Sequence, residues 1–111
     1  MRKSFTAVVE QGNTFTENFS TEPYEVAWAS EARWFVRVLE IDGNEPGLQL
    51  YPEISPDGLF WCQDNTSSLK IEGEGLYSVA QHDFGHWLRL NGRLSGTGTR
   101  FKLIVYLALK E

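Results

Sequence analysis

The strongest periodic pattern in the chain is Phe101-Lys102-Leu103-Ile104-Val105-Tyr106-Leu107-Ala108-Leu109-Lys110. Its odd-numbered positions are all apolar, which is the two-residue period that places alternate side chains of a β-strand on one face. The even-numbered positions carry Ile104, Tyr106 and Ala108 in the middle and lysines near the ends. The pattern therefore predicts a central strand that is covered on one face and partly covered on the other.

Two patterns upstream also predict strands, each followed by turn-forming residues. Residues 33–41, Arg-Trp-Phe-Val-Arg-Val-Leu-Glu-Ile, are dense in β-branched and aromatic side chains, and Asp-Gly-Asn-Glu-Pro-Gly at 42–47 is typical of a strand exit. Residues 48–54 alternate apolar and polar side chains, and Ser-Pro-Asp-Gly at 55–58 places proline and glycine for a tight turn. We therefore expect two separate strands joined by a turn.

The residues before the final strand predict a further strand and two places where the chain turns. Residues 84–94 place Leu88 and Leu90 on one face and polar or aromatic side chains on the other. Asn91-Gly92 has the composition of a hairpin turn or a β-bulge. The run Gly-Thr-Gly-Thr-Arg at 96–100 leads into a strand and not into a helix, so it predicts a flexible hairpin loop and no phosphate site.

Four weaker strand patterns complete the prediction, at residues 5–10, 24–29, 69–72 and 76–81. About eight short strands with Gly-rich turns and no long helical pattern predict an all-β fold, an antiparallel β-sandwich in which jelly-roll connections are one way to order the strands. The whole chain, residues 1–111, is expected to form a single domain. Within it, residues 11–23 are polar with two isolated phenylalanines, which predicts an extended arm or a long loop.

Length and charge exclude several classes of protein. A chain of 111 residues has the size of one domain, too small for a two-domain enzyme or a membrane transporter. Its net charge of −5 would repel the phosphate backbone of a nucleic acid, and no apolar run approaches the roughly 20 residues that span a bilayer. No apolar leader precedes Glu10, so we expect synthesis and initial retention in the cytoplasm.

The two histidines are the only residues whose spacing suggests a metal site. On a helix His82 and His86 would share one face, but in an extended chain four residues separate their side chains by about 13 Å. A tight turn at the Phe-Gly between them would be needed to bring them together, with Asp83 or Cys62 completing the site. Metal binding therefore stays open as the lesser alternative to two ordinary polar histidines.

The other candidates for catalysis have structural interpretations. Cys62, the single cysteine, lies beside Trp61 and lacks an activating base, so we interpret it as a small apolar residue at the end of a strand. Glu72 and Glu74 share one face of a predicted strand, where we interpret them as solvated charges that block unwanted strand pairing and not as a glycosidase pair. We therefore expect no enzymatic activity, no cofactor and no resident metal.

The aromatic residues are the stronger signal. Four tryptophans, at positions 28, 34, 61 and 87, lie in or beside predicted strands, and a domain this small cannot enclose all of them fully. Core packing is expected for at least two of the four, and the others are expected to face a partner or a ligand. The predicted interface residues are Phe15, Phe19, Trp28, Trp61 and Trp87.

Two kinds of partner fit such residues. Exposed rings anchor protein interfaces, and Phe15 and Phe19 of the predicted arm would then bury in a neighbouring subunit. In the alternative, Trp or Tyr rings stack on sugars while Asp57, Asp64 or Asn65 supplies hydrogen bonds, which would make the protein a carbohydrate-binding module.

Part of the chain resembles a known group of small β-sandwich proteins. The segment Leu-Gln-Leu-Tyr-Pro-Glu-Ile-Ser-Pro-Asp-Gly-Leu-Phe-Trp at 48–61 is followed by a polar loop, by Gly-Leu-Tyr at 75–77 and by Phe-Gly-His-Trp-Leu-Arg-Leu at 84–90. This order of a Ser-Pro-Asp-Gly strand end, a nearby Trp and a later strand with an aromatic, Arg and Leu is similar to that of accessory proteins of tailed phages and phage-derived particles, both capsid-decorating and tail-associated. The similarity covers residues 33–109.

The resemblance implies a β-sandwich without catalytic residues. It implies a structural subunit that decorates or joins a virion or a phage-like particle, with further copies of the chain and a shell or tail protein as its partners. No nucleic acid and no membrane is expected as a partner, and a glycan remains the alternative ligand.

Overall fold

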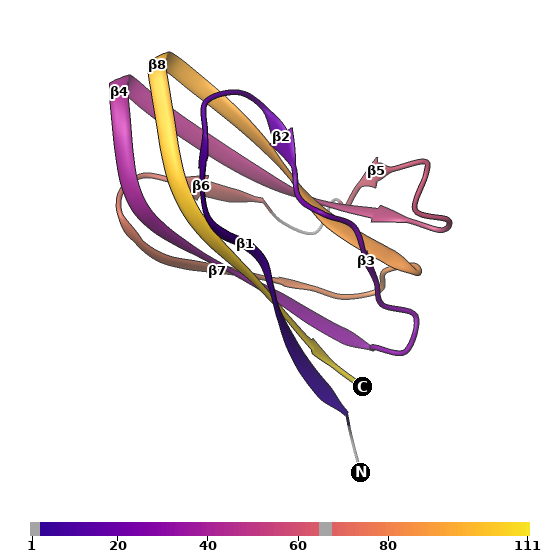
Figure 1. The fold of residues 1–111 in the computed structure, drawn as a ribbon. Helices are drawn as coiled ribbons and strands as arrows, with labels where there is room; N and C mark the ends of the chain where they lie inside the picture. Colours follow the sequence, from indigo (N-terminus) through magenta and orange to yellow (C-terminus); the bar gives the residue numbers. More distant parts are fainter. Residues whose placement is uncertain (1–2, 65–67) are drawn as a thin grey trace.

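The computed structural model describes residues 3–64 and 68–111, and these form strands and loops without a helix (Figure 1). The strands are β1 (Ser4–Phe15), β2 (Phe19–Ser20), β3 (Tyr24–Glu25), β4 (Glu31–Ser55), β5 (Cys62–Gln63), β6 (Leu69–Ile71), β7 (Gly75–Gln81) and β8 (Trp87–Lys110). Every strand pair is antiparallel, so the predicted all-β antiparallel class is confirmed. The described residues contain no helix that could span a membrane.

Two long strands, β4 and β8, build the framework. They pair along almost their whole length, from Glu31 opposite Lys110 to Ser55 opposite Trp87, and the ribbon that they form bends near its middle so that its halves face each other (Figure 1). β1 and β7 flank one half and complete the first layer. β2 and β3 flank the other half on one side, β5 and β6 on the other, and complete the second layer. The two layers are therefore one continuous sheet folded over itself.

Glycines make this bend. Gly43 has a φ of +126°, and a Cβ there would lie 2.9 Å from the Cα of Thr99 on the partner strand. Gly96 has a φ of +93°, and a Cβ there would clash with the carbonyl oxygens of Asn44 and Glu45. Both positions need a backbone conformation that side chains disfavour and a close approach that a side chain would block. These two positions in the corner of the sheet are therefore restricted to glycine.

The separate turns predicted for residues 42–47 and 96–100 are wrong. Both segments lie inside continuous strands, where register shifts around Asn44 absorb the bend. Pairing of the two strands resumes after each shift, because both strands curve at the same place. The turn predicted at residues 55–58 is confirmed, since β4 ends at Ser55.

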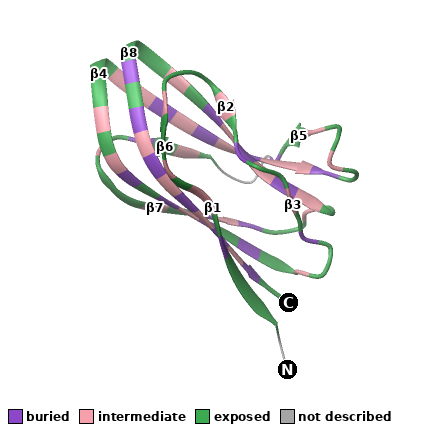
Figure 2. Ribbon diagram, viewed as in Figure 1, coloured by how far each residue is buried: buried purple, intermediate pink, exposed green. Residues whose placement is uncertain are grey.

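The core lies between the two layers, and the final strand has the predicted alternation (Figure 2). Its odd-numbered residues from Phe101 to Leu109 are buried, whereas Ile104, Tyr106 and Ala108 are half-buried on the opposite face. β8 lies between β1 and β4, which confirms the predicted central position. The core also takes in Trp34, Val36, Val38, Leu48, Leu50, Leu88 and Leu90.

A buried polar chain links the two layers. Trp34 on β4 donates its indole N–H to the Oε1 of Gln81 on β7, at 2.9 Å. Gln81 is fully buried and donates its Nε2 to the Oδ2 of Asp64, also at 2.9 Å. Asp64 follows β5 in the second layer, and its backbone N–H reaches the carbonyl of Pro52. These hydrogen bonds satisfy polar groups that would each be costly to bury without a partner.

Residues 11–23 differ from the predicted arm or long loop. Residues 11–15 complete β1, and Phe15 stacks on Phe19 of β2 with ring centroids 3.8 Å apart. The Phe19 ring lies over Gly92 so closely that a Cβ at that glycine would overlap it. Asn91-Gly92 is therefore a regular part of β8 and not the predicted hairpin or bulge. The glycine there makes room for a ring.

Candidate interaction surfaces

Trp34 is the one tryptophan in the core, so the expectation that at least two of the four pack there is wrong. Trp34 is fully buried, whereas Trp28 is 37% exposed in the connection between β3 and β4. Trp61 and Trp87 are half-buried in the second layer. A Cβ at Gly58 would lie 3.0 Å from the Trp87 ring, so the turn after β4 packs directly on that indole. Three of the five predicted interface residues are thus partly exposed tryptophans.

The other two, Phe15 and Phe19, are engaged within the chain. Both are half-buried, stack on each other and pack against the core. Their part as anchors in a neighbouring subunit stays a prediction, but their own packing means that removing them would disturb the fold as well.

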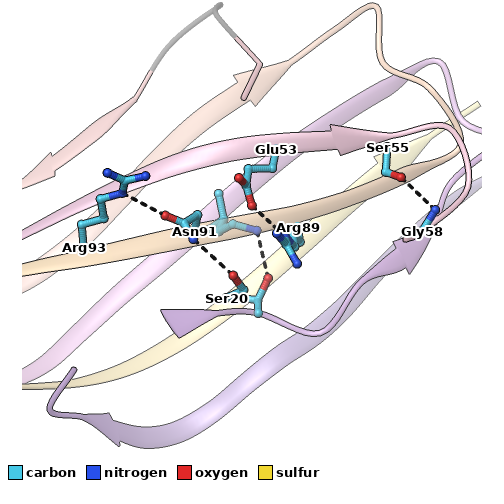
Figure 3. A network of polar contacts seen from close by, with 9 residues as sticks. Ser20, Glu53, Ser55, Gly58, Arg89, Asn91 and Arg93 are labelled. Atoms are coloured by element: carbon cyan, nitrogen blue, oxygen red, sulfur yellow. Dashed lines mark hydrogen bonds and ion pairs between the residues drawn. The ribbon is translucent and has the colours of Figure 1, made fainter. Parts of the chain in front are cut away.

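The outer face of the second layer is named here the polar face, and its side chains bond to one another (Figure 3). Arg89 pairs its Nε with Glu53 Oε1 at 2.7 Å and places its guanidinium carbon 4.3 Å from the centre of the Trp61 ring. Arg89 and Glu53 face each other across β8 and β4. The carboxylate and the ring thus hold the same cation from two sides, a charge-assisted bond joined to a cation–π contact.

The polar face continues toward the corner of the sheet in the same way. Arg93 lies over the Tyr51 ring, 5.6 Å from its centre, and donates its Nε to Asn91 at 3.3 Å. Asn91 in turn donates its Nδ2 to Ser20 Oγ at 3.2 Å (Figure 3). The Tyr51 hydroxyl donates to Gln49 Oε1 at 2.7 Å. The Trp61 and Tyr51 rings of this face are therefore each covered by an arginine of the same chain.

The tight turn after β4 is held by two side chains. Ser55 Oγ accepts the N–H of Gly58 at 2.8 Å, and Asp57 Oδ1 accepts the N–H groups of Leu59 and Phe60 at 2.9 and 3.0 Å. Those N–H donations, first from Phe60 and then from Leu59, lower the pKa of the Asp57 carboxyl below its ordinary 3.8. Leu59 and Phe60 are each 77% exposed, so a well-ordered turn presents two apolar side chains to solvent.

We expect this turn to loosen in acid. Because the folded-state pKa of Asp57 is lowered, its contribution is complete above pH 3.8, the value for an unfolded chain, and is lost as the pH falls through the lower folded value. NMR of the Leu59 and Phe60 amides should show a titration below pH 3.8. Asp57→Ala should speed exchange of both amides at neutral pH, and Asp57→Asn should keep part of the protection because its oxygen still accepts. A midpoint at or above 3.8 would contradict the assignment.

The outer face of the first layer is apolar in its centre. Val8, Tyr106, Phe35 and Ser78 lie side by side across β1, β8, β4 and β7. Ile104 and Leu76 lie on the row to one side of these residues, and Ala108 and Ala80 lie on the row to the other side. None of these aromatic and aliphatic side chains packs against the core, and Val8 and Leu76 are 48% and 66% exposed. In the part of the chain that the structure describes, no third layer covers this surface, here named the apolar face (Figure 1).

The apolar face carries an excess of positive charge, in contrast to the acidic chain. Glu31 lies opposite Lys110 and Glu40 opposite Lys102, so these pairs balance at the two ends. Arg33 and Arg37 lie in the middle, beside Phe35, without acidic residues opposite them in the ladders. The sequence carried a signal for this surface, the apolar even-numbered positions of the last strand, but the central strand alone could not show whether anything covered them.

The residues considered for chemistry are dispersed. Among residues 3–64 and 68–111, no three His, Cys, Asp or Glu side chains lie close enough to hold a metal ion. His82 and His86 are both exposed, and Cys62, interpreted from the sequence as a small apolar residue at the end of a strand, is exposed at the start of β5. Glu72 lies between β6 and β7, and its Oε1 is 3.8 Å from the Nζ of Lys70, with which it forms an exposed ion pair.

The hydrogen-bonding residues predicted for a sugar are used elsewhere. The Asp57 carboxylate accepts backbone N–H groups of its own turn, and Asp64 is buried against Gln81. Asn65 lies outside the described residues. Asp57 and Asp64 are therefore both engaged within the chain, and carbohydrate binding stays a prediction.

Comparison with known proteins shows the fold alone. No protein-family model and no curated protein matches the sequence. Among solved structures, the PBSX exported protein XepA matches 95% of this chain with a TM-score of 0.69 at 13% identity. Dimeric latent PorU from Porphyromonas gingivalis matches 99% of it with a TM-score of 0.54 at 12% identity. This chain spans 36% of the first protein and 13% of the second, so in both the fold is part of a longer polypeptide.

Proposed function

We propose that this protein is a non-enzymatic structural subunit that joins a larger protein particle through its apolar face. The observation that carries the proposal is the row of Val8, Tyr106 and Phe35, all partly exposed and separate from the core. A contiguous apolar surface left open to water is unfavourable unless a partner covers it, and such surfaces mark interaction sites.

The charges indicate the chemistry of the partner. Arg33 and Arg37 give the centre of the apolar face an excess of positive charge, although the chain as a whole carries −5. The fitting partner is a protein surface with an apolar centre and carboxylates placed to meet these two arginines. A shell or tail protein of a phage-like particle is the partner suggested by the resemblance of residues 48–61 and 84–90 to phage accessory proteins.

The solved structures of this fold agree with such a role. XepA and PorU each hold the fold next to other parts of a longer chain, and latent PorU is itself dimeric. Within residues 3–64 and 68–111 of this protein, no further layer of strands lies over the apolar face (Figure 1).

Two matched tyrosine substitutions test the proposal. Tyr106→Glu places a charge in the apolar face, and Tyr51→Glu places the same charge on the polar face of the other layer. When particles from the native cell are separated on a density gradient, wild type and Tyr51→Glu should sediment with them, whereas Tyr106→Glu should bind about thirtyfold more weakly. Circular dichroism checks that both variants fold. Equal co-sedimentation of the two variants, or none for the wild type, would overturn the proposal.

Carbohydrate binding is the alternative, supported by the partly exposed Tyr51 and Trp61 rings on one face. The arginines that cover these rings argue against it, because a sugar would have to displace Arg89 and Arg93 first. If the protein binds carbohydrate, wild type and Tyr106→Glu should bind to a glycan array and Tyr51→Glu should not. For binding to particles, the two variants should behave in the opposite way.

A further inference from the structure

The first layer has two edge strands, and they are protected to different degrees. β1 carries register shifts between Val8 and Glu10 and between Gln11 and Asn13, and such bulges discourage a further strand from pairing. β7 pairs with β4 without a shift, over all seven residues from Gly75 to Gln81. The strands at the edges of the second layer have only two or three residues. β7 is therefore the long regular edge among the described strands.

The side chains of β7 add no protection. Its sequence, Gly-Leu-Tyr-Ser-Val-Ala-Gln, contains no charge and no proline, the two features that usually guard an edge. Glu72 and Glu74, interpreted from the sequence as charges that block strand pairing, lie in the connection before β7 and not within it. The only ladder that β7 forms is the one with β4, among the strands that the structure describes. Its other side is a row of backbone groups available to a strand.

We propose that β7 pairs with β7 of a second copy of this chain, about a two-fold axis at Ser78. This inference rests on the proposed role in assembly and names its first contact. Antiparallel pairing centred on Ser78 keeps both apolar faces on the same side of one extended sheet and pairs all seven residues of the strand. It also brings Glu74, exposed before β7, toward the exposed His82 of the second copy, which follows that strand.

The side chains on the outer side of β7 suit this register. It places Leu76, which is 66% exposed, next to Ala80 of the second copy. Ala80 borders a hollow of about 380 Å³ on the apolar face, which Phe35, Ala108 and His82 also line. The large exposed residue of one copy thus lies beside the space left by small residues of the other, and the two-fold axis repeats the contact. Self-complementarity of this kind is what a two-fold interface requires.

The contact between the two copies is small. Seven residue pairs and two leucine contacts form an interface below about 1,200 Å², the range of weak and transient complexes. We therefore expect a dissociation constant in the micromolar range. Such a dimer would be sparse in dilute solution and would form at the high local concentration of an assembled particle.

Ser78 allows a test that leaves the fold intact. Its side chain is exposed and its Oγ accepts a hydrogen bond from Arg33 Nη1 at 3.0 Å, so a glutamate there keeps a partner in its own chain. In the dimer, Ser78→Glu would place two carboxylates beside each other at the axis and should weaken association about tenfold or more. Thr6→Glu adds the same charge to exposed β1, at the opposite edge of the layer, and should have no effect.

Sedimentation velocity over a wide range of concentration, extending to the millimolar, measures the association. Wild type and Thr6→Glu should form dimers and Ser78→Glu should stay monomeric. An equal mixture of Ser78→Glu and Ser78→Lys should form dimers again, because opposite charges then meet at the axis. Hydrogen exchange of β7 amides should slow as wild-type concentration rises, which reports pairing of the backbone itself.

The outcomes separate this inference from the proposed function. A wild type that stays monomeric, or a Ser78→Glu variant that dimerises as the wild type does, would overturn pairing through β7. If Ser78→Glu then still sediments with particles and Tyr106→Glu does not, the role of the apolar face stands without it. If wild type dimerises as described but does not sediment with particles, the dimer stands and the proposed function fails.

Discussion

Trp34→Ala is expected to lower the free energy of unfolding by about 5 kcal/mol, the largest effect of any single substitution considered. Removing a fully buried Trp from a core costs about 3–5 kcal/mol through lost contacts and the cavity left behind. Here the indole N–H is also the donor to Gln81, whose side chain amide is fully buried, and an acceptor left without its donor adds about 1–3 kcal/mol. Since domains of this kind unfold at about 5–15 kcal/mol, this loss would remove about a third or more of the total stability.

Urea denaturation followed by far-ultraviolet circular dichroism measures this effect, because the signal does not depend on the tryptophan removed. Trp28→Ala is the matched control, since Trp28 is 37% exposed, and it should cost about 1 kcal/mol or less. Trp34→Phe keeps most of the ring volume and removes the N–H, so it should fall between the two. A Trp34→Ala variant as stable as Trp28→Ala would show that the buried polar chain does not link the layers as described.

Gly96→Ala is expected to cost about 3 kcal/mol through the corner of the sheet. The glycine has a φ of +93°, which an alanine adopts only with strain, and its Cβ would lie 2.8 Å from the carbonyl oxygen of Asn44. The clash is with backbone of the partner strand, which cannot move away without opening the bend that brings the two layers together. The expected result is a lower midpoint of thermal and urea denaturation.

A second glycine of the same corner supplies the control. Gly98 has a φ of +64° and no atom within 4 Å of the position that a Cβ would take, so Gly98→Ala should cost about 1 kcal/mol from backbone strain alone. The difference between the two variants isolates the contribution of close packing at the bend. Equal losses would mean that the corner widens freely and that strain alone restricts these positions.

The structure shows which of the aromatic rings outside the core are covered by other segments of the chain. Trp61 and Trp87 are half-buried, and Arg89 covers one ring while the turn at Gly58 packs on the other. Composition indicates that some rings must lie outside the core, because the core of a small domain is limited. It carries no information on which outside rings are free, since the covering residue comes from a distant segment.

The apolar face could not be predicted from the sequence, because it is formed by segments that are distant along the chain. Phe35 and Tyr106 are neighbours only because β4 pairs with β8, and Val8 joins them only through the pairing of β1. A strand with apolar residues on both faces is read correctly as central, yet one of its faces is open here. Coverage depends on the number of layers, which no single strand encodes.

The sequence by itself determined the all-β class, the positions of most strands and the inward-facing residues of the final strand. These follow from local alternation of side chains along an extended backbone, which needs no knowledge of the neighbours. Tertiary structure alone decided that β4 and β8 run unbroken through a corner and that Phe15 and Phe19 pack on each other. A Gly-rich segment can either reverse the direction of the chain in a hairpin or bend a continuous strand. Here the strand bends, because it pairs with a partner strand that bends at the same place.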